Sequence, residues 1–225
     1  MKKLFQLAFK GLVVVSPWRI KRRLLENCWN YKLHSTSKIG LSWIYPEYLE
    51  MSEGAKIGHF NVAVHLHQMI LKPHASIARG NWITGYPKGG QKHFSHRSDR
   101  SPCLLMGAHS AVTKNHHLDC TDRITIGPFT TIAGYHSQLL THSIDVHECR
   151  QDSAPIHLGD HCFIGTNVVV LGGSRLPDRS VLGAKALLNK AFELPDHLYG
   201  GVPAKDLGKL EGVSKYFYRE CGFVI

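Results

Sequence analysis

A six-residue spacing of aliphatic side chains constrains the fold of this chain more than any other feature of its sequence. In the clearest run, every sixth residue is aliphatic: Leu158, Ile164, Val170, Leu176, Leu182 and Leu188. Small or short residues follow each of the first five by four positions: Cys162, Val168, Ser174, Ser180 and Ala186. A helix needs apolar residues every three or four positions, and a half-buried strand needs them every two. The six-residue step is instead typical of a parallel β-helix, in which each unit forms one short flat face and a corner.

The same spacing recurs upstream and predicts how the coils stack. One run contains Leu71, Ile77 and Ile83, and the next contains Met106, Val112, Leu118 and Ile124. The phase then shifts by two residues to a run in which one polar residue breaks the apolar rule: Ile126, Ile132, Gln138 and Ile144. Three units close one triangular turn, so residues about eighteen apart stack at the ~4.8 Å spacing of paired strands. Residues that interrupt the period should therefore leave the stack as outward loops.

The period divides the chain into three parts. We expect a basic, helical segment over residues 1–37, a β-helix over 38–207 and a carboxy-terminal cap over 208–225. Outward loops are expected at 85–103 and 145–157, where the period is interrupted. The apolar content of 43% and charged content of 20% are typical of a soluble protein with one core.

The six cysteines give an expectation about the compartment. They form no CxxC pair and do not have the spacing of a disulfide framework. This pattern predicts reduced thiols and a cytoplasmic location.

The amino-terminal segment carries most of the net charge. Residues 1–40 hold nine lysines and arginines against one glutamate, which is +8 of the total +10. Residues 4–15 are apolar but contain Lys10, so they are too short and too charged to span a bilayer. They also lack a secretory cleavage signal. Two compatible interpretations remain: a helical cap on the first coil, and a basic amphipathic helix that rests on the inner face of an anionic membrane. No nucleic-acid-binding motif accompanies the basic residues, so no nucleic-acid partner is expected.

The repeat and two further segments together resemble the hexapeptide-repeat acyltransferases. The segments are Ile-Ala-Gly-Tyr-His-Ser-Gln-Leu-Leu-Thr-His-Ser-Ile-Asp at 132–145 and Gly-Gly-Val-Pro-Ala-Lys at 200–205. Within that family, the chain most resembles sugar O-acetyltransferases of bacterial surface-polysaccharide or lipopolysaccharide biosynthesis. The resemblance implies an all-β, left-handed parallel β-helix. It also implies a homotrimer with sites shared between subunits, acetyl-coenzyme A as acyl donor, a sugar or glycan acceptor, and no metal.

The resemblance also implies a general base. His142 follows Thr141 immediately before an interruption of the period, where the family has its catalytic histidine. A neutral imidazole can take the proton from a sugar hydroxyl as it attacks a thioester, because the histidine pKa lies near neutral pH. We expect Asp145 to fix the tautomer of His142. His116 is the second candidate for the base.

Coenzyme A should lie along the last coils. Where the family has G-A-x-S, T-K and G-N-P-A-K, this chain has Gly-Ala-Lys-Ala at 183–186, Asn-Lys at 189–190 and Gly-Val-Pro-Ala-Lys at 201–205. The resemblance therefore assigns cofactor binding to Ala184, Lys185, Lys190 and Lys205. Lysine side chains can hold the phosphates as point charges.

Two other functions are compatible with the same coil. Carbonic anhydrases of the hexapeptide class bind a metal with three histidines across subunits. His142 and His147 have a suitable spacing, and His109, His116 or His117 could complete such a zinc site. A β-helix without catalytic activity could also serve as a scaffold, and it would not bind acyl-coenzyme A.

Overall fold

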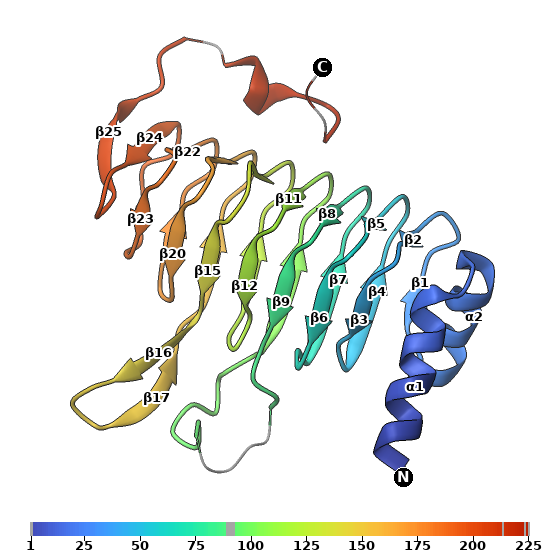
Figure 1. Ribbon diagram of the computed structural model, residues 1–225. Coiled ribbons are helices and arrows are strands. Elements are labelled where there is room, and N and C mark those ends of the chain that lie inside the picture. Colours follow the sequence, from blue (N-terminus) through green and yellow to red (C-terminus); the bar gives the residue numbers. More distant parts are fainter. Residues whose placement is uncertain (1, 89–92, 213, 223, 225) are drawn as a thin grey trace.

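Two helices cover one end of a stack of short strands (Figure 1). The computed structural model describes residues 2–88, 93–212, 214–222 and 224. Helix α1 (Lys2–Val15) and helix α2 (Trp18–Trp29) are separated at Pro17, because proline cannot continue a helix from the preceding turn. Val13 and Leu25 are buried where the two helices meet the stack. α2 ends at Asn30, which adopts a left-handed φ of 55° and donates its N–H to the Leu25 carbonyl.

In the described part of the chain, three parallel sheets form the sides of the stack. The first sheet has seven strands: β1 (Lys32–Leu33), β4 (Tyr48–Met51), β7 (Gln68–Leu71), β10 (Cys103–Met106), β13 (Ile124–Ile126), β18 (Ile156–Leu158) and β21 (Arg175–Leu176). The second has nine: β2 (Lys38–Ile39), β5 (Lys56–Ile57), β8 (Ser76–Arg79), β11 (Ala111–Lys114), β14 (Thr131–Ile132), β19 (Phe163–Ile164), β22 (Val181–Leu182), β24 (His197–Gly200) and β25 (Lys205–Lys209). The third has seven: β3 (Trp43–Tyr45), β6 (Val62–Val64), β9 (Trp82–Thr84), β12 (His117–Asp119), β15 (Gln138–Leu140), β20 (Val169–Leu171) and β23 (Leu187–Leu188). The chain therefore passes from the first sheet to the second and then to the third in every coil.

The six-residue period is confirmed in the core. Leu158, Ile164 and Val170 pair with Leu176, Leu182 and Leu188 of the next coil, and all six side chains are fully buried. The small residues that follow each of the first five by four positions are buried too, at 2% exposure or less. A larger side chain there would have no room inside the triangular section, since protein interiors are close-packed.

The predicted phase is wrong after Ile132. Leu139 points into the core and Gln138 is exposed, whereas the period predicted the reverse. One additional residue in the corner between β14 and β15 causes the shift. Gly134 and His136 both adopt left-handed φ values there, of 71° and 60°. Ile144, which was also predicted to point inward, is 67% exposed.

Two predicted boundaries also need correction. The first coil begins at Lys32 in β1, whereas the β-helix was expected from residue 38. The predicted loop at 145–157 is an antiparallel hairpin of β16 (His142–Asp145) and β17 (Arg150–Ser153). Ile156 already belongs to the first sheet. In the predicted loop at 85–103, β9 ends at Thr84 and β10 begins at Cys103, while residues 89–92 lie outside the described residues.

The carboxy-terminal residues return along the side of the stack (Figure 1). β25 pairs antiparallel with β24 at the edge of the second sheet. The short 3₁₀ helix η1 (Lys215–Tyr218) follows, and the Tyr216 hydroxyl donates to the Cys162 carbonyl at 3.3 Å. Arg219 donates to the Phe129 carbonyl, so this segment reaches coils in the middle of the stack.

Candidate functional site

His142 stands at the root of the hairpin, where the chain leaves the third sheet. Its Nδ1 lies 3.8 Å from Oδ2 of Asp119, and its ring packs edge-on against Phe94 with the centroids 5.8 Å apart. Nε2 is buried and has no hydrogen-bond partner among the described residues. The preceding Thr141 is fully buried and donates its hydroxyl to the Asp119 carbonyl at 2.7 Å. The backbone beside His142 is therefore fixed to the same coil that supplies the carboxylate.

Asp119 is held so that one of its oxygens faces His142. Its Oδ1 accepts hydrogen bonds from the backbone N–H and the hydroxyl of Thr121, at 2.9 and 2.7 Å. Oδ2 is the oxygen nearer to His142. A carboxylate in this position favours the tautomer with a proton on Nδ1 and stabilises the imidazolium that forms on proton uptake.

The structure does not bring Asp145 to His142. Asp145 accepts hydrogen bonds from the backbone N–H groups of His147 and Glu148, at 3.1 and 3.2 Å, and it lies 3.5 Å from Arg150. Residues three apart on a strand point to opposite faces, because side chains alternate. Asp119 therefore takes the place predicted for Asp145.

His116 is enclosed in the corner before β12. Its side chain is buried, Nδ1 accepts the Ser137 N–H at 3.1 Å, and Nε2 lies 2.9 Å from the Thr113 hydroxyl. Burial, together with the nearby His136, lowers its pKa to about 4. A neutral imidazole with both nitrogens engaged has a structural role, so the geometry does not support His116 as the second candidate for the base.

The outer face of the third sheet carries a shallow groove beside Asp119. Trp82, His117 and Gln138 lie in register on β9, β12 and β15. They line a groove of about 430 Å³, in which the Trp82 side chain is 55% exposed. Asp119 is two residues beyond His117 on β12. Both therefore point outward, about 7 Å apart along the strand.

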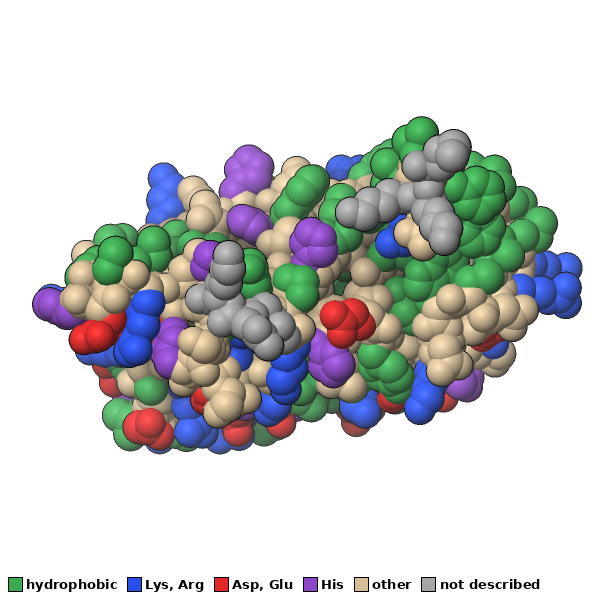
Figure 2. Space-filling view, turned by 90° about the horizontal axis from the view of Figure 1, so that it is seen from below, with side chains coloured by type: hydrophobic (Ala, Val, Ile, Leu, Met, Phe, Trp, Pro, Cys, Tyr) green, Lys and Arg blue, Asp and Glu red, His purple; other side chains and the backbone are tan. Residues whose placement is uncertain are grey.

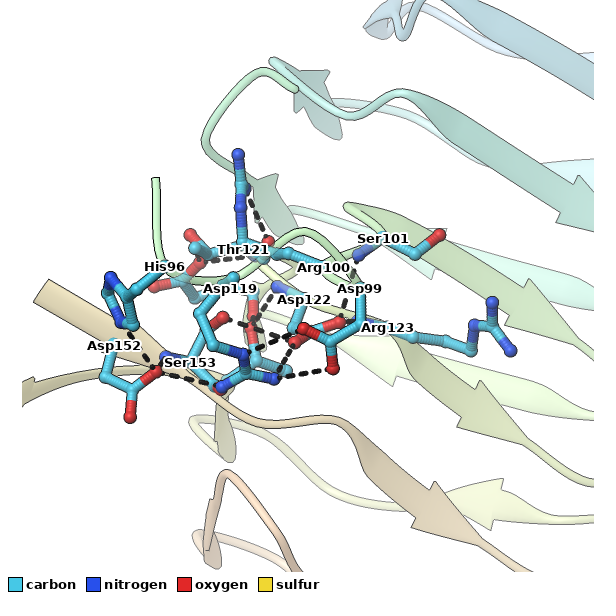
Figure 3. A network of polar contacts seen from close by, with 12 residues as sticks. His96, Asp99, Arg100, Ser101, Asp119, Thr121, Asp122, Arg123, Asp152 and Ser153 are labelled. Carbon is cyan, nitrogen blue, oxygen red and sulfur yellow. Dashed lines mark hydrogen bonds and ion pairs between the residues drawn. The ribbon is translucent and has the colours of Figure 1, made fainter. Parts of the chain in front are cut away.

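A network of arginines and carboxylates joins the residues before β10 to the hairpin (Figure 3). Arg97 pairs with Asp152 at 2.9 Å, with Asp99 at 3.0 Å and with the buried Asp122 at 3.5 Å. It also donates to the Ser153 carbonyl. The hydrogen bond from Arg97 holds the pKa of Asp99 below its ordinary value.

Asp152 responds to two opposing effects. Burial raises its pKa, but the Ser153 N–H and the Arg97 guanidinium outweigh that effect and hold the pKa below its ordinary value. Asp152 is therefore ionised at neutral pH, and its ion pair with Arg97 fixes the residues before β10 to the hairpin.

Arg100 positions Phe94 over His142. Its guanidinium donates to the carbonyls of Tyr86, Pro87 and Thr121 at 2.7–2.8 Å. The same group lies 4.3 Å from the centre of the Phe94 ring, which is 5% exposed. Phe94 and Arg97 both fall in the loop expected at 85–103, but nothing in the sequence indicated their roles.

The residues predicted to bind coenzyme A lie at the carboxy-terminal end of the stack. Ala184 and Lys185 form the exposed corner between β22 and β23, where Lys185 has a left-handed φ of 59°. The Lys190 ammonium lies 5.0 Å from the centre of the Phe192 ring. Lys205 opens β25 and pairs with Gly200. All four side chains are exposed.

The histidines considered for zinc are dispersed. His147 lies in the turn of the hairpin, and His109 stacks between His74 and Phe129 at 4.8 Å from each. Over residues 2–88, 93–212, 214–222 and 224, no group of three or more His, Cys, Asp or Glu side chains could hold a metal ion.

Comparison with known proteins identifies relatives of part of the sequence. No family model matches it. YvoF of Bacillus subtilis (strain 168), which is named as an acetyltransferase, is 33% identical over 85 residues, or 37% of this chain and 46% of YvoF. The galactoside O-acetyltransferase of Escherichia coli (strain K12) is 30% identical over 99 residues, or 42% of this chain and 48% of that enzyme. The chain spans about half the length of the curated relatives it matches.

Solved structures show the fold. The polysialic acid O-acetyltransferase OatWY has a TM-score of 0.60 and 16% identity, over 82% of this chain and 87% of that one. A variant of AntD, an N-acyltransferase from Bacillus cereus in complex with dTDP and coenzyme A, has a TM-score of 0.54 and 12% identity, over 88% and 92% of the two chains. The predicted left-handed parallel β-helix is confirmed, and so is the resemblance to hexapeptide-repeat acetyltransferases.

Proposed function

We propose that this chain transfers an acetyl group from acetyl-coenzyme A to a sugar hydroxyl, with His142 as the general base. The observation that carries this proposal is the pair of His142 and Asp119, at the point where the hairpin leaves the third sheet. The names of both curated relatives support acetyl transfer, and the names of the galactoside O-acetyltransferase and of OatWY support a sugar hydroxyl as acceptor.

Proton transfer would take place at Nε2, which is buried in this structure and must become accessible when the acceptor binds. Asp119 faces Nδ1 and favours the tautomer in which Nε2 carries the lone pair. The present separation of 3.8 Å must shorten for a full hydrogen bond, and catalytic hydrogen bonds are often longer before substrate binds. Phe94 packs on the ring and helps to exclude water from it.

His142 would act twice in one turnover. It takes the proton of the acceptor hydroxyl as that oxygen attacks the thioester carbonyl. When the carbon–sulfur bond breaks, the imidazolium returns the proton to the departing thiolate. Atoms and charges then balance, and the products are an acetyl ester and the free coenzyme thiol.

The groove on the third sheet is the proposed site of the acceptor. Trp82 offers an exposed aromatic face to the apolar side of a sugar ring. The Gln138 amide and the His117 imidazole provide polar atoms beside it for sugar hydroxyls. Asp119 lies about 7 Å from His117 along β12. A sugar that extends from this groove toward Asp119 would bring a hydroxyl within reach of His142.

Coenzyme A is proposed to lie against the last coils, at Ala184, Lys185, Lys190 and Lys205. The lysine ammonium groups are exposed there and can pair with phosphates. We further propose a homotrimer with sites between subunits, and a role in surface-polysaccharide biosynthesis at the cytoplasmic face of the membrane. Of the helices described, none has the length and apolar character needed to span a bilayer.

Replacing the base tests the proposal directly. His142→Ala should lower kcat by about 10²–10⁴-fold, the usual contribution of a general base. Release of the coenzyme thiol from acetyl-coenzyme A would be followed with a galactoside and with polysialic acid as acceptors. Calorimetric titration with coenzyme A should give the same Kd for both proteins, because the proposed cofactor residues are on other coils.

Three outcomes would contradict the proposal. Full activity of the His142→Ala protein would exclude His142 as the base. Failure of the unmodified chain to bind coenzyme A would favour a non-catalytic scaffold. A stoichiometric zinc ion in the purified protein would favour the metalloenzyme instead.

A further inference from the structure

Helix α1 presents large apolar side chains to solvent along its outer face. Leu4, Leu12 and Val15 are 74%, 61% and 67% exposed, and Phe5 and Leu7 flank them at 75% and 55%. On the opposite side of the helix, Val13 is buried and packs on the core. A surface helix of a globular protein normally carries charged or polar residues on its outer face. α1 is instead apolar on both sides.

The adjoining helix α2 carries exposed basic residues. Arg19 and Arg23 are exposed on α2, beside Ile20, which is 53% exposed. Glu26 is the one acid among the first forty residues, and Arg22 already pairs with it at 2.8 Å. The apolar face of α1 and the excess positive charge of this end together match a lipid surface, which has an apolar interior and anionic headgroups.

The shape of this end suits a helix lying flat on that surface. α1 has 14 residues, which span about 21 Å, less than the ~30 Å of a bilayer core. Figure 2 shows the hydrophobic side chains gathered over the helical end of the molecule. In Figure 1, the amino-terminal end of α1 and the β16–β17 hairpin project from the same lower edge of the stack. α1 runs down the outside of the helical end in Figure 1, so a flat surface that faces this side of the molecule can meet α1 along its length.

We propose that α1 docks this protein on an anionic lipid surface. Leu4, Phe5, Leu7, Leu12, Val15 and Ile20 enter the boundary between headgroups and acyl chains, and Arg19 and Arg23 pair with the headgroup phosphates. The charge argues against a second copy of the chain as occupant, because two segments of net charge +8 would repel each other. The docking surface uses no residue of the proposed catalytic site.

Vesicle sedimentation with the full chain tests the docking surface. The probes are vesicles of phosphatidylcholine alone and of phosphatidylcholine mixed with phosphatidylglycerol. The unmodified chain should partition at least about tenfold more strongly onto the anionic vesicles. The double variant Leu12→Gln/Val15→Gln should lose about tenfold or more of that partitioning, and Arg19→Glu/Arg23→Glu should lose the preference for anionic lipid.

Matched controls separate docking from folding and from general stickiness. Phe60→Gln removes a side chain that is 73% exposed on a coil corner, and it should leave partitioning unchanged. Circular dichroism would check that each variant keeps its β-helix. Equal binding to both kinds of vesicle, or unchanged binding of the Leu12→Gln/Val15→Gln protein, would overturn the proposal. It would also be overturned if that variant changed the oligomeric state in sedimentation velocity, because the face would then belong to a contact between copies.

Discussion

His142 receives its neighbours from three separate parts of the chain. Asp119 comes from the preceding coil, Phe94 from the residues before β10, and Thr141 from its own coil. In a β-helix, each side chain on a sheet has its lateral neighbour on the adjacent coil, about twenty positions away in the sequence. A partner three positions away on the same strand lies on the other face.

The two aspartates provide a matched pair of variants. Asp119→Asn should lower kcat between about tenfold and 10⁴-fold, because the amide no longer stabilises the imidazolium or selects its tautomer. Asp145→Asn should leave kcat near that of the unmodified chain, since Asp145 caps the hairpin turn. Steady-state kinetics on the two variants would decide between them. If Asp145→Asn lowered kcat and Asp119→Asn did not, Asp145 would be the partner of His142, as the sequence predicted.

The proposed base was within reach of sequence reasoning, and the carboxylate beside it was not. His142 stands next to Thr141 in a motif and immediately before an interruption, so its local context marks it. Locating Asp119 requires the register between β12 and β15, in which Asp119 pairs with Leu140. The period placed Gln138 inward and misaligned that register by one residue. A corner can absorb one residue without any change of composition that the sequence would reveal.

The hairpin and the residues before β10 act as one element because Arg97 joins them. Its ion pair to Asp152 connects two insertions that are far apart in the sequence, and its ion pair to Asp122 joins them to a corner between β12 and β13. Arg100 then holds Phe94 against His142. The position of the proposed base therefore depends on contacts outside the regular coils.

Removing the Arg97 guanidinium should loosen this element. Arg97→Met should increase proteolytic cleavage within residues 93–102 and lower kcat about tenfold, because Asp122 is left buried without that partner and the segment that carries Phe94 is no longer held to the hairpin. Limited proteolysis and kinetics would follow the two effects. Arg123→Met is the matched control, since its guanidinium extends away from Asp152 in Figure 3. Equal effects of the two variants would show that Arg97 has no special part in holding the loop.

The regular coils of the whole molecule were predictable, and the ends were not. From Ile156 to Leu188 each side chain has the burial that the six-residue period requires, because identical steps face identical surroundings. The first coil begins at Lys32, and the period fails there because the buried residues Ile39 and Ile44 are five positions apart, not six. The antiparallel β25 lacks the period, since its five residues are all exposed.

Acid should destabilise the stack through His116. Its pKa is about 4 in the folded protein, against an ordinary value of 6.5. The unfolded chain therefore binds the proton first, and the free energy of unfolding falls as the pH drops from 6.5 to 4. The loss for this group is about 3 kcal/mol over that window.

Urea unfolding at pH 7 and pH 4 measures this effect. His116→Gln should lose less stability between the two pH values than the unmodified chain, by about 3 kcal/mol. His157→Gln, at an exposed position on β18, should keep the pH dependence of the unmodified chain. If His116→Gln keeps it as well, protonation of His116 does not contribute to acid unfolding.

The strand register is continuous across both insertions. Leu71 pairs with Met106 although the loop intervenes, and Ile126 pairs with Leu158 although the hairpin intervenes. The strand pairing of the β-helix therefore does not depend on the length or composition of the segments inserted at its corners. Evolution could replace these two segments without redesigning the framework, and a protein engineer could do the same by grafting both together with the arginine that joins them.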